Sequence, residues 1–294
     1  MRTIVIAGAS GFVGQHMKRH FESSGWRVLT IGRSASDGVW SDQSSLVRAL
    51  IGADAVVNLA GKSVNCRFTK ANVKELIRSR VETTQAIGEA IGLCKSPPPV
   101  WINASGASIY REQVTSPNTE DSPTDGAGTM AEVARLWERA FFESPTPDTR
   151  KAALRITLVL GRNGGVFPIF KTLVKLGQGG RQGSGEQMMS WIHVDDLCSA
   201  MLWIINQNSI GAIVNAAAPS PMSNADFMSD FRKATHVKVG LPAPELLIRI
   251  GTGIIGADSE LVLRGMDVVP HALAKSGFTF QFPSLQSALA DLLN

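Results

Sequence analysis

Three glycines near the N-terminus have the spacing of a phosphate-binding loop. Gly8, Gly11 and Gly14 follow an apolar strand pattern at 3–7 and open a helical pattern at 12–23. We expect Gly8 to permit the tight turn, Gly11 to let the backbone approach a pyrophosphate, and Gly14 to let the helix pack closely. The helix N-terminus would then present N–H groups to the phosphate. A plain strand-to-helix turn is the alternative, but the surrounding pattern favours a dinucleotide site.

The end of the next predicted strand, residues 27–31, indicates which dinucleotide binds. NAD-binding chains usually carry an acidic residue here, which holds the ribose 2′-hydroxyl. This chain has Gly32 and Arg33 instead, and the nearest acid, Asp37, lies beyond the expected turn. A guanidinium can pair with a 2′-phosphate through two charge-assisted hydrogen bonds. A solvated loop arginine is the alternative, and we predict NADP(H) rather than NAD(H).

Strand-like and helix-like runs alternate along the chain. The predicted strands are 3–7, 27–31, 55–59, 100–104, 152–158 and 212–216, and the predicted helices are 12–23, 43–50, 69–93, 128–142, 166–176, 195–206 and 224–234. This alternation predicts an α/β fold, a Rossmann-like doubly wound parallel sheet with helices on both faces. From about residue 239 the chain changes to short helical pieces. We therefore expect a nucleotide-binding domain at 1–238, with substrate-side insertions after about residue 160, and a small C-terminal cap domain at 239–294.

The composition excludes several classes of protein. The chain has 294 residues, of which 44% are hydrophobic and 18% charged, so a large core is feasible. Its net charge of +4 comes from scattered basic residues, which does not indicate nucleic-acid binding. Three cysteines without a CxxC pattern suit a reducing compartment. No apolar run is long enough for a membrane span. We expect a cytoplasmic protein with no nucleic-acid or membrane partner.

The histidines offer a weaker signal for metal binding. His16 and His20 have the i, i+4 spacing that metal ligands can have, but no third ligand follows from the sequence. We expect a solvated helix face there and no metal site. His193 could contact a substrate, although a hydrogen bond within the fold is the preferred interpretation. Asp195 or Asp196 is expected to cap the helix that follows.

Eight segments, taken in order, resemble a known family. The chain resembles the extended short-chain dehydrogenase/reductases, and more narrowly the atypical epimerase-like family with its own C-terminal domain, within the NAD(P)-dependent epimerase/dehydratase superfamily. The segments are GASGFVG (8–14), VVNLAGKSV (56–64), SRVETT (79–84), LWE (136–138), LVLGRNGG (158–165), SWIHVDD (190–196), NAAAPSPMSNADF (215–227) and LVLRGMDVVPHALAKSGFTFQFPSL (261–285).

The resemblance implies an NADP(H) cofactor and a set of contact positions. Arg33 would lie at the adenosine 2′-phosphate and Val159 near the nicotinamide. Glu75 and Arg80 would reach the cofactor from the long helix, but solvated helix charges are an equal alternative. The full implied set is Gly8, Ser10, Gly11, Phe12, Val13, Gly14, Gly32, Arg33, Leu59, Ala60, Gly61, Glu75, Arg80 and Val159.

The same resemblance exposes a gap in the expected chemistry. Extended members carry a Ser or Thr and a Tyr-x-x-x-Lys pair, in which the lysine lowers the tyrosine pKa for proton transfer. Alignment on Glu138 places Met130 at the tyrosine position and Ala134 at the lysine position. Ser105 matches the family serine, and Tyr110 is the only tyrosine of the chain. These two are the catalytic candidates, although a packing or hydrogen-bonding role is preferred for Tyr110.

Two functional hypotheses remain. The first is an NADP(H)-dependent oxidoreductase or epimerase-like enzyme that acts on an unknown small polar substrate. The second is a non-catalytic NADP(H)-binding redox sensor or scaffold, linked by the resemblance to cell or organelle division. By analogy with the family, a homodimer would form through the helices at 69–93 and 128–142.

Overall fold

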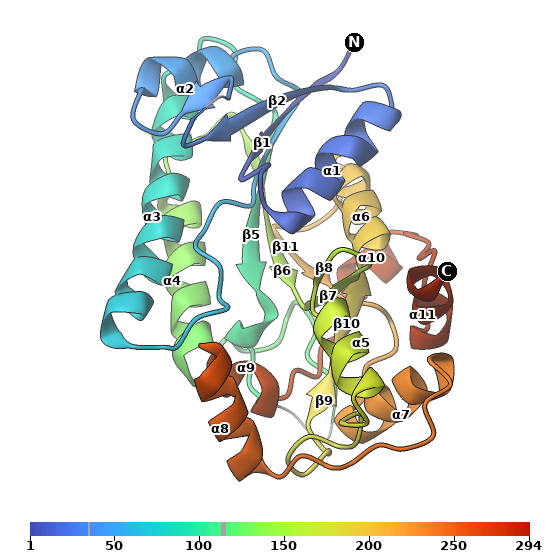
Figure 1. Ribbon diagram of the computed structural model, residues 1–294. Coiled ribbons are helices and arrows are strands. Elements are labelled where there is room, and N and C mark those ends of the chain that lie inside the picture. Colours follow the sequence, from blue (N-terminus) through green and yellow to red (C-terminus); the bar gives the residue numbers. More distant parts are fainter. Residues whose placement is uncertain (35, 113–115) are drawn as a thin grey trace.

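A parallel seven-stranded sheet forms the centre of the described chain, with strand order β11-β6-β5-β4-β1-β2-β3 (Figure 1). The computed structural model describes residues 1–34, 36–112 and 116–294. The strands are β1 (Thr3–Ala7), β2 (Arg27–Gly32), β3 (Gly38–Val39), β4 (Ala55–Asn58), β5 (Val100–Gly106), β6 (Arg150–Ile156) and β11 (Ile213–Ala216). The strand order reverses beside β1, and open α/β sheets bind their ligands outside the carboxyl ends at such a point.

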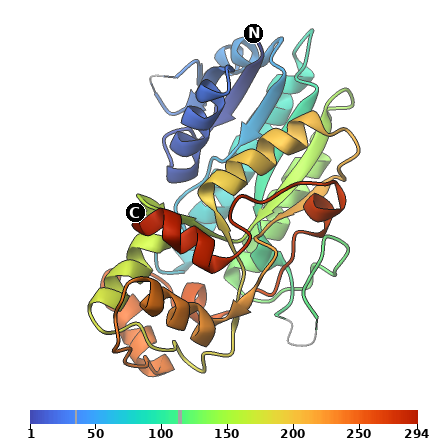
Figure 2. The same ribbon diagram turned by 90° about the vertical axis from the view of Figure 1, so that its right-hand side faces the viewer.

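Helices cover both faces of this sheet (Figures 1 and 2). One face packs on α1 (Phe12–Ser23) and α6 (Val194–Asn206), and the other on α2 (Gln43–Leu50), α3 (Lys70–Gly92) and α4 (Thr129–Glu143). Strand β1 shows why this happens. Ile4 and Ile6 belong to the first core and Val5 and Ala7 to the second, because successive side chains of a strand point to opposite faces. The predicted Rossmann-like doubly wound fold is confirmed.

The second half of the chain adds two small sheets. Strands β7 (Leu158–Gly161), β8 (Gly164–Gly165) and β10 (Trp191–His193) form one, and β9 (Met188–Met189) pairs with β12 (Met222–Ser223) in the other. The prediction of a single strand at 152–158 was wrong. The amide of Thr157 donates to Ala216 of the main sheet, whereas that of Leu158 donates to Ser190, so the chain changes sheets between these residues.

The remaining helices pack at the carboxyl side and around the small sheets. Helices α5 (Phe167–Lys175), α7 (Asn224–Ala234) and α11 (Leu285–Leu293) share an apolar core with β7 and β10. Helix α10 (His271–Lys275) lies against β11, while α8 (Glu245–Ile255) and α9 (Glu260–Leu263) lie near the start of α4 (Figure 1). Residues 239–294 thus contribute to several parts of the structure, and the boundary at 238 stays a prediction. Across the described residues, no helix combines the length and apolarity that a membrane span requires.

Candidate functional site

In the loop between β1 and α1, a side chain at either of two glycines would clash with the neighbouring backbone. Gly8 has φ +82°, and a Cβ atom there would lie 2.8 Å from the carbonyl carbon of Leu59. A Cβ atom on Gly14 would lie 2.3 Å from the carbonyl oxygen of Gly8. On Gly11, the nearest described atom would be at 3.4 Å, an ordinary contact. The protein therefore packs against Gly8 and Gly14 and leaves space beside Gly11, as a bound pyrophosphate requires.

Other residues of the loop contribute in different ways. The ring of Phe12 lies against the β7–β8 hairpin, since a Cβ atom on Gly161 or Gly164 would come within 2.3 Å of it. Phe12 can therefore contact a cofactor through its backbone, because its ring is packed against the hairpin. Ser10 is exposed, and its carbonyl oxygen accepts a hydrogen bond from the side chain of Gln15. Val13 lines a cavity at the carboxyl ends of β5 and β6.

Arg33 lies exposed at the carboxyl end of β2, directly after Gly32. The nearby carboxylate of Asp37 accepts a hydrogen bond of 2.7 Å from the amide of Thr30, and this contact holds the turn after β2. Asp37 is thus engaged with the backbone. The arrangement suits recognition of an anion at the strand end by Arg33.

The turn after β4 is built around Asn58. Its side-chain oxygen accepts from the amide of Ala60 at 3.0 Å, which shapes the segment Leu59, Ala60 and Gly61. Gly61 faces the side chain of Arg80, and a Cβ atom on it would lie 3.1 Å from the guanidinium carbon. This turn lies beside Gly8, so two of the predicted cofactor segments meet at the carboxyl edge of the sheet.

Arg80 is a buried cation in the wall of a cavity that lies at the carboxyl ends of β5 and β6. It is 8% exposed, donates to the carbonyl of Leu76 at 3.1 Å, and lies over the ring of Trp137 with 5.0 Å to its centroid. Burial lowers the pKa of Arg80 to about 10, so it is charged at neutral pH. The indole of Trp137 donates to Thr84 at 2.9 Å, which holds the ring in place beneath the guanidinium.

Glu75, one turn before Arg80, lies elsewhere. Its carboxylate pairs with Arg78 at 2.8 Å on the outer face of α3. The hydrogen bond from Arg78 holds the pKa of Glu75 below its usual range. The structure thus brings Arg80, but not Glu75, to the cavity wall, and the contact of Glu75 with a cofactor stays a prediction. Val159, on β7, is partly exposed and its carbonyl accepts from Val166.

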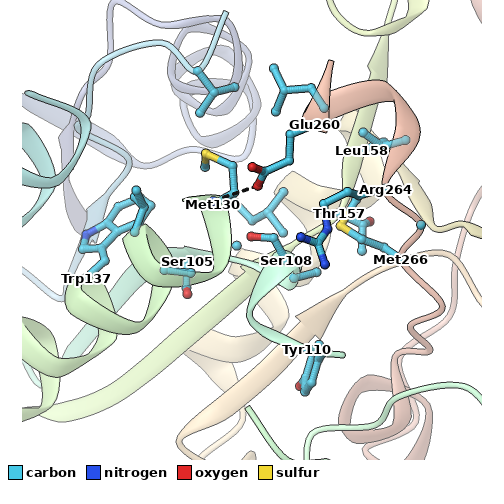
Figure 3. Close-up of a pocket in the computed structure, with 18 of the residues that line it drawn as sticks. Ser105, Ser108, Tyr110, Met130, Trp137, Thr157, Leu158, Glu260, Arg264 and Met266 are labelled. Carbon is cyan, nitrogen blue, oxygen red and sulfur yellow. Dashed lines mark hydrogen bonds between the residues drawn. The ribbon is translucent and has the colours of Figure 1, made fainter. Parts of the chain in front are cut away.

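A cavity of about 410 Å³ lies at the carboxyl ends of β5 and β6 (Figure 3). Its volume falls within the usual range for small-molecule sites, roughly 300–1,000 Å³. Met130 and Ala134, which occupy the expected tyrosine and lysine positions, both line it. The site therefore presents a thioether and a methyl group where the usual proton-transfer pair would stand.

Both catalytic candidates, Ser105 and Tyr110, line this cavity and belong to a buried polar network in its wall. Ser105 donates to Glu138 at 2.7 Å, and Glu138 accepts two hydrogen bonds of 2.8 Å from Arg155. Arg155 also donates to the phenol oxygen of Tyr110 at 2.7 Å, and that phenol donates to Asn215 at 2.8 Å. Both hydroxyl groups are thus engaged inside the protein.

The electrostatics of the network oppose a tyrosinate. Burial raises the pKa of Tyr110, and the neighbouring Arg155 offsets this only in part. A neutral phenol suits the hydrogen-bonding role preferred from the sequence, and the catalytic role of Ser105 and Tyr110 stays a prediction. Sequence reasoning missed Glu138 and Arg155 as partners. One signal was present, since Arg155 follows the apolar run Ala152–Leu154 inside strand β6.

The C-terminal segment supplies two charged residues that sequence reasoning also missed. The carboxylate of Glu260 accepts from the amides of Thr129 and Met130, each at 3.1 Å, at the start of α4. Arg264 forms an ion pair of 2.8 Å with Glu112. Figure 3 shows Glu260 and Arg264 on the side of the cavity opposite Trp137. The sequence could not predict the contacts of Glu260 and Arg264, because their partners are more than 100 residues away in the chain.

The expected solvated face at His16 was wrong. His16 is half-buried and pairs with Asp195 of α6. The Nδ1 atom of the buried His193 accepts from the amide of Asp195 at 3.2 Å and so caps α6. His193, Asp195 and Asp291 bring potential ligand atoms within 4.8 Å of one another. However, a neutral imidazole that accepts at Nδ1 carries its proton on Nε2, which makes that nitrogen a donor rather than a metal ligand.

Comparison with known proteins identifies the class. Residues 4–217 match the NAD dependent epimerase/dehydratase family, and residues 243–292 match a domain of unknown function, DUF1731. The chain therefore belongs to the NAD dependent epimerase/dehydratase family, which confirms the resemblance seen in the sequence.

Relatives span the whole chain. It is 29% identical over 294 residues to the human epimerase family protein SDR39U1, with 99% of each chain covered. It is 31% identical to the epimerase family protein SSP1921 of Staphylococcus saprophyticus, with 100% of each covered. A crystal structure of human SDR39U1 with NADPH superimposes with a TM-score of 0.90, at 29% identity and covering 99% of this chain and 98% of that one. MoeE5 in complex with UDP-glucuronic acid and NAD shares the fold, with a TM-score of 0.76 at 22% identity, covering 98% and 96%.

Proposed function

We propose that the chain binds NADP(H) and is an oxidoreductase or epimerase-like enzyme for a small molecule. The observation that carries the proposal is the glycine loop, which leaves space for a pyrophosphate beside Gly11. Arg33 lies at the end of the neighbouring strand β2, where it can reach a 2′-phosphate. The NADPH named with the human relative's structure supports this choice of dinucleotide.

The chain's own groups suggest how such a cofactor would be held. The loop at Gly8–Gly14 and the start of α1 would bind the pyrophosphate. Arg33 would bind the 2′-phosphate, and the turn at Leu59–Gly61 would line the adenosine side. Arg80 would place a positive charge beside the nicotinamide end, because it lines the cavity.

When bound, NADPH would supply the hydride. The protein would hold the substrate next to it and provide a path for a proton. Because the hydroxyls of Ser105 and Tyr110 are engaged by Glu138 and Arg155, we propose that water in the cavity exchanges the proton. Arg80, the buried cation, would stabilise negative charge that develops on a substrate oxygen.

A non-catalytic NADP(H)-binding sensor or scaffold is the second candidate. Met130 and Ala134 favour it, since neither side chain can transfer a proton and both face the cavity. This candidate predicts cofactor binding without turnover, and a partner protein whose affinity differs between NADPH and NADP⁺. A cytoplasmic location and a homodimer through α3 and α4 are further proposals, tested by fractionation and by solution mass.

Replacement of Arg33 by alanine tests the cofactor assignment. A charge-assisted hydrogen-bonded contact contributes about 1.5–3 kcal/mol, so the Arg33→Ala protein should bind NADPH roughly 10–100-fold more weakly. Its affinity for NADH should be unchanged. The matched control is Arg27→Ala, an exposed arginine at the opposite end of the same strand. Equal loss for NADPH and NADH, or no loss for either, would contradict the assignment.

A further inference from the structure

The cavity has two chemically different ends. One end, beside Val13 and Arg80, adjoins the glycine loop and α3. The other end, here called the substrate end, lies between the start of α4 and the C-terminal segment. It is lined by Ser108, Glu112, Ala127, Met130, Glu260, Leu261, Arg264 and Met266.

Apart from its charged residues, the substrate end is lined mostly by apolar side chains. Met130, Leu261 and Met266 contribute their side chains from three different segments, together with the methyl group of Ala127. Figure 3 shows Met130 and Met266 on opposite sides of the space. Methionine side chains are flexible and polarisable, so such a wall adapts to flat or irregular apolar groups. Ligand sites are commonly apolar, and the charged groups must therefore decide the substrate class.

The natural anion site at this end is already filled. A helix N-terminus attracts phosphates and carboxylates through its free amides and its dipole. At α4, the amides of Thr129 and Met130 donate instead to the carboxylate of Glu260. An anionic substrate would have to displace Glu260 or lie beside its negative charge.

The single cation of the substrate end is also engaged. Arg264 pairs with Glu112 at 2.8 Å. Among the described lining residues of this end, two carboxylates therefore face one guanidinium. The undescribed residues 35 and 113–115 include no lysine or arginine in the sequence. A diphosphate placed at this end would meet two carboxylates and a guanidinium that is already paired, while Arg80, the other cation of the cavity, lies at the opposite end. Such a placement is unfavourable in a partly desolvated site.

We infer that the substrate end accepts an uncharged, largely apolar carbonyl compound, and not a nucleotide sugar. The inference rests on the proposed NADP(H)-dependent function for the reacting carbonyl, but the charge argument is independent of it. Size agrees, since about 410 Å³ must also admit the end of the cofactor and lies near the lower limit for ligand sites. The inference thus differs from the sequence analysis, which predicts a small polar substrate.

Equilibrium binding of three probes tests the inference. The probes are 2-acetylnaphthalene, an uncharged aromatic ketone; 2-naphthoate, which has the same rings with a carboxylate; and UDP-glucose. Calorimetric titration of the full chain, with and without NADPH, should show the ketone binding at least about tenfold more tightly than either anion. Tighter binding of either anion, or binding of none of the three by protein that binds NADPH, would overturn the inference.

Two substitutions locate the binding. Met130→Gln should weaken binding of the ketone severalfold, because it places a polar amide in the apolar wall. Met222→Gln is the control, as Met222 is also half-buried but lies on β12 and does not line the cavity. Glu260→Gln should raise the affinity for 2-naphthoate, since it removes the negative charge at the start of α4. Equal effects of the two methionine variants, or no gain for 2-naphthoate, would contradict the site.

The two proposals fail separately. Protein that binds the ketone but no dinucleotide would refute the NADP(H) proposal and leave the apolar substrate end standing. Protein that binds NADPH but prefers UDP-glucose would refute the substrate inference and leave the cofactor proposal standing.

Discussion

The phenol oxygen of Tyr110 lies between the guanidinium of Arg155 and the side-chain oxygen of Asn215. The sequence could predict that Ser105 and Tyr110 lie near the carboxyl end of the same strand, because the strand pattern is local. It could not predict Glu138 and Arg155 as their partners, since these come from α4 and β6. At the scale of residues, the glycine loop was predictable for the same local reason, whereas the hydrogen-bond network depends on the fold.

Removal of the Tyr110 hydroxyl tests whether it holds the network. In Tyr110→Phe, Arg155 and Asn215 each lose a buried partner, and the free energy of unfolding should fall by about 1–3 kcal/mol. Affinity for NADPH should be unchanged. Urea unfolding and calorimetry measure the two effects. If the variant were fully stable but lost all turnover of a found substrate, Tyr110 would be the proton donor instead.

Gly14 offers a second test at this scale. A Cβ atom there would overlap the carbonyl oxygen of Gly8 at 2.3 Å, so Gly14→Ala must displace the loop or α1. Overpacking of this kind costs about 1–3 kcal/mol, and NADPH binding should weaken with it. In Gly211→Ala, where no described atom lies within 4 Å of the new Cβ, both quantities should stay as in the parent protein. An unchanged Gly14→Ala protein would contradict the predicted close packing.

Among the elements, helices were predicted best. Helices α1, α2 and α7 have the bounds expected from the apolar period, and α3 and α4 each begin and end one residue from the prediction. The strands β3, β7 to β10 and β12 were missed, and most of them have only two or three residues, too few positions to show a period. The start of α4 depends on a distant element, since Gly128 offers no side-chain cap and Glu260 of α9 takes that role.

The contribution of Glu260 to α4 can be measured. A carboxylate at a helix N-terminus stabilises by about 0.3–1 kcal/mol, and by up to about 2 kcal/mol when partly buried. Glu260→Gln should lower the free energy of unfolding by an amount in that range, as measured with urea. Glu82→Gln, an exposed carboxylate in the middle of α3 that pairs with Arg78, should change it by less than about 0.5 kcal/mol. Equal effects of the two variants would show that the contact with α4 adds nothing.

For the whole molecule, two histidines whose pKa is lowered by burial link stability to pH. Burial lowers the pKa of His193, which faces Asp195, Asp291, Asp196 and His16. Its folded pKa lies below the unfolded value of about 6.5, so the unfolded chain binds more protons in the interval between them. Stability therefore rises with pH there, and is lost as pH falls from about 6.5. His20, whose pKa burial also lowers, acts in the same direction.

Urea unfolding at pH 8, 7, 6 and 5 measures this link. We expect the midpoint to stay level between pH 8 and 7 and to decrease below about 6.5. In His193→Gln the urea midpoint should decrease less between pH 7 and pH 5 than in the parent protein. Its midpoint at pH 8 should be lower than that of the parent, because Nδ1 no longer caps α6. A midpoint that rises on acidification would contradict the buried neutral state of His193.

The proposed function depends on a working NADP(H) site in this fold. Calorimetric titration of the purified protein, freed of any bound nucleotide, with NADPH, NADP⁺, NADH and NAD⁺ tests it most directly. We expect NADPH and NADP⁺ to bind at least about tenfold more tightly than NADH and NAD⁺, because Arg33 would bind the 2′-phosphate. Failure of all four to bind, or a preference for NADH and NAD⁺, would contradict it.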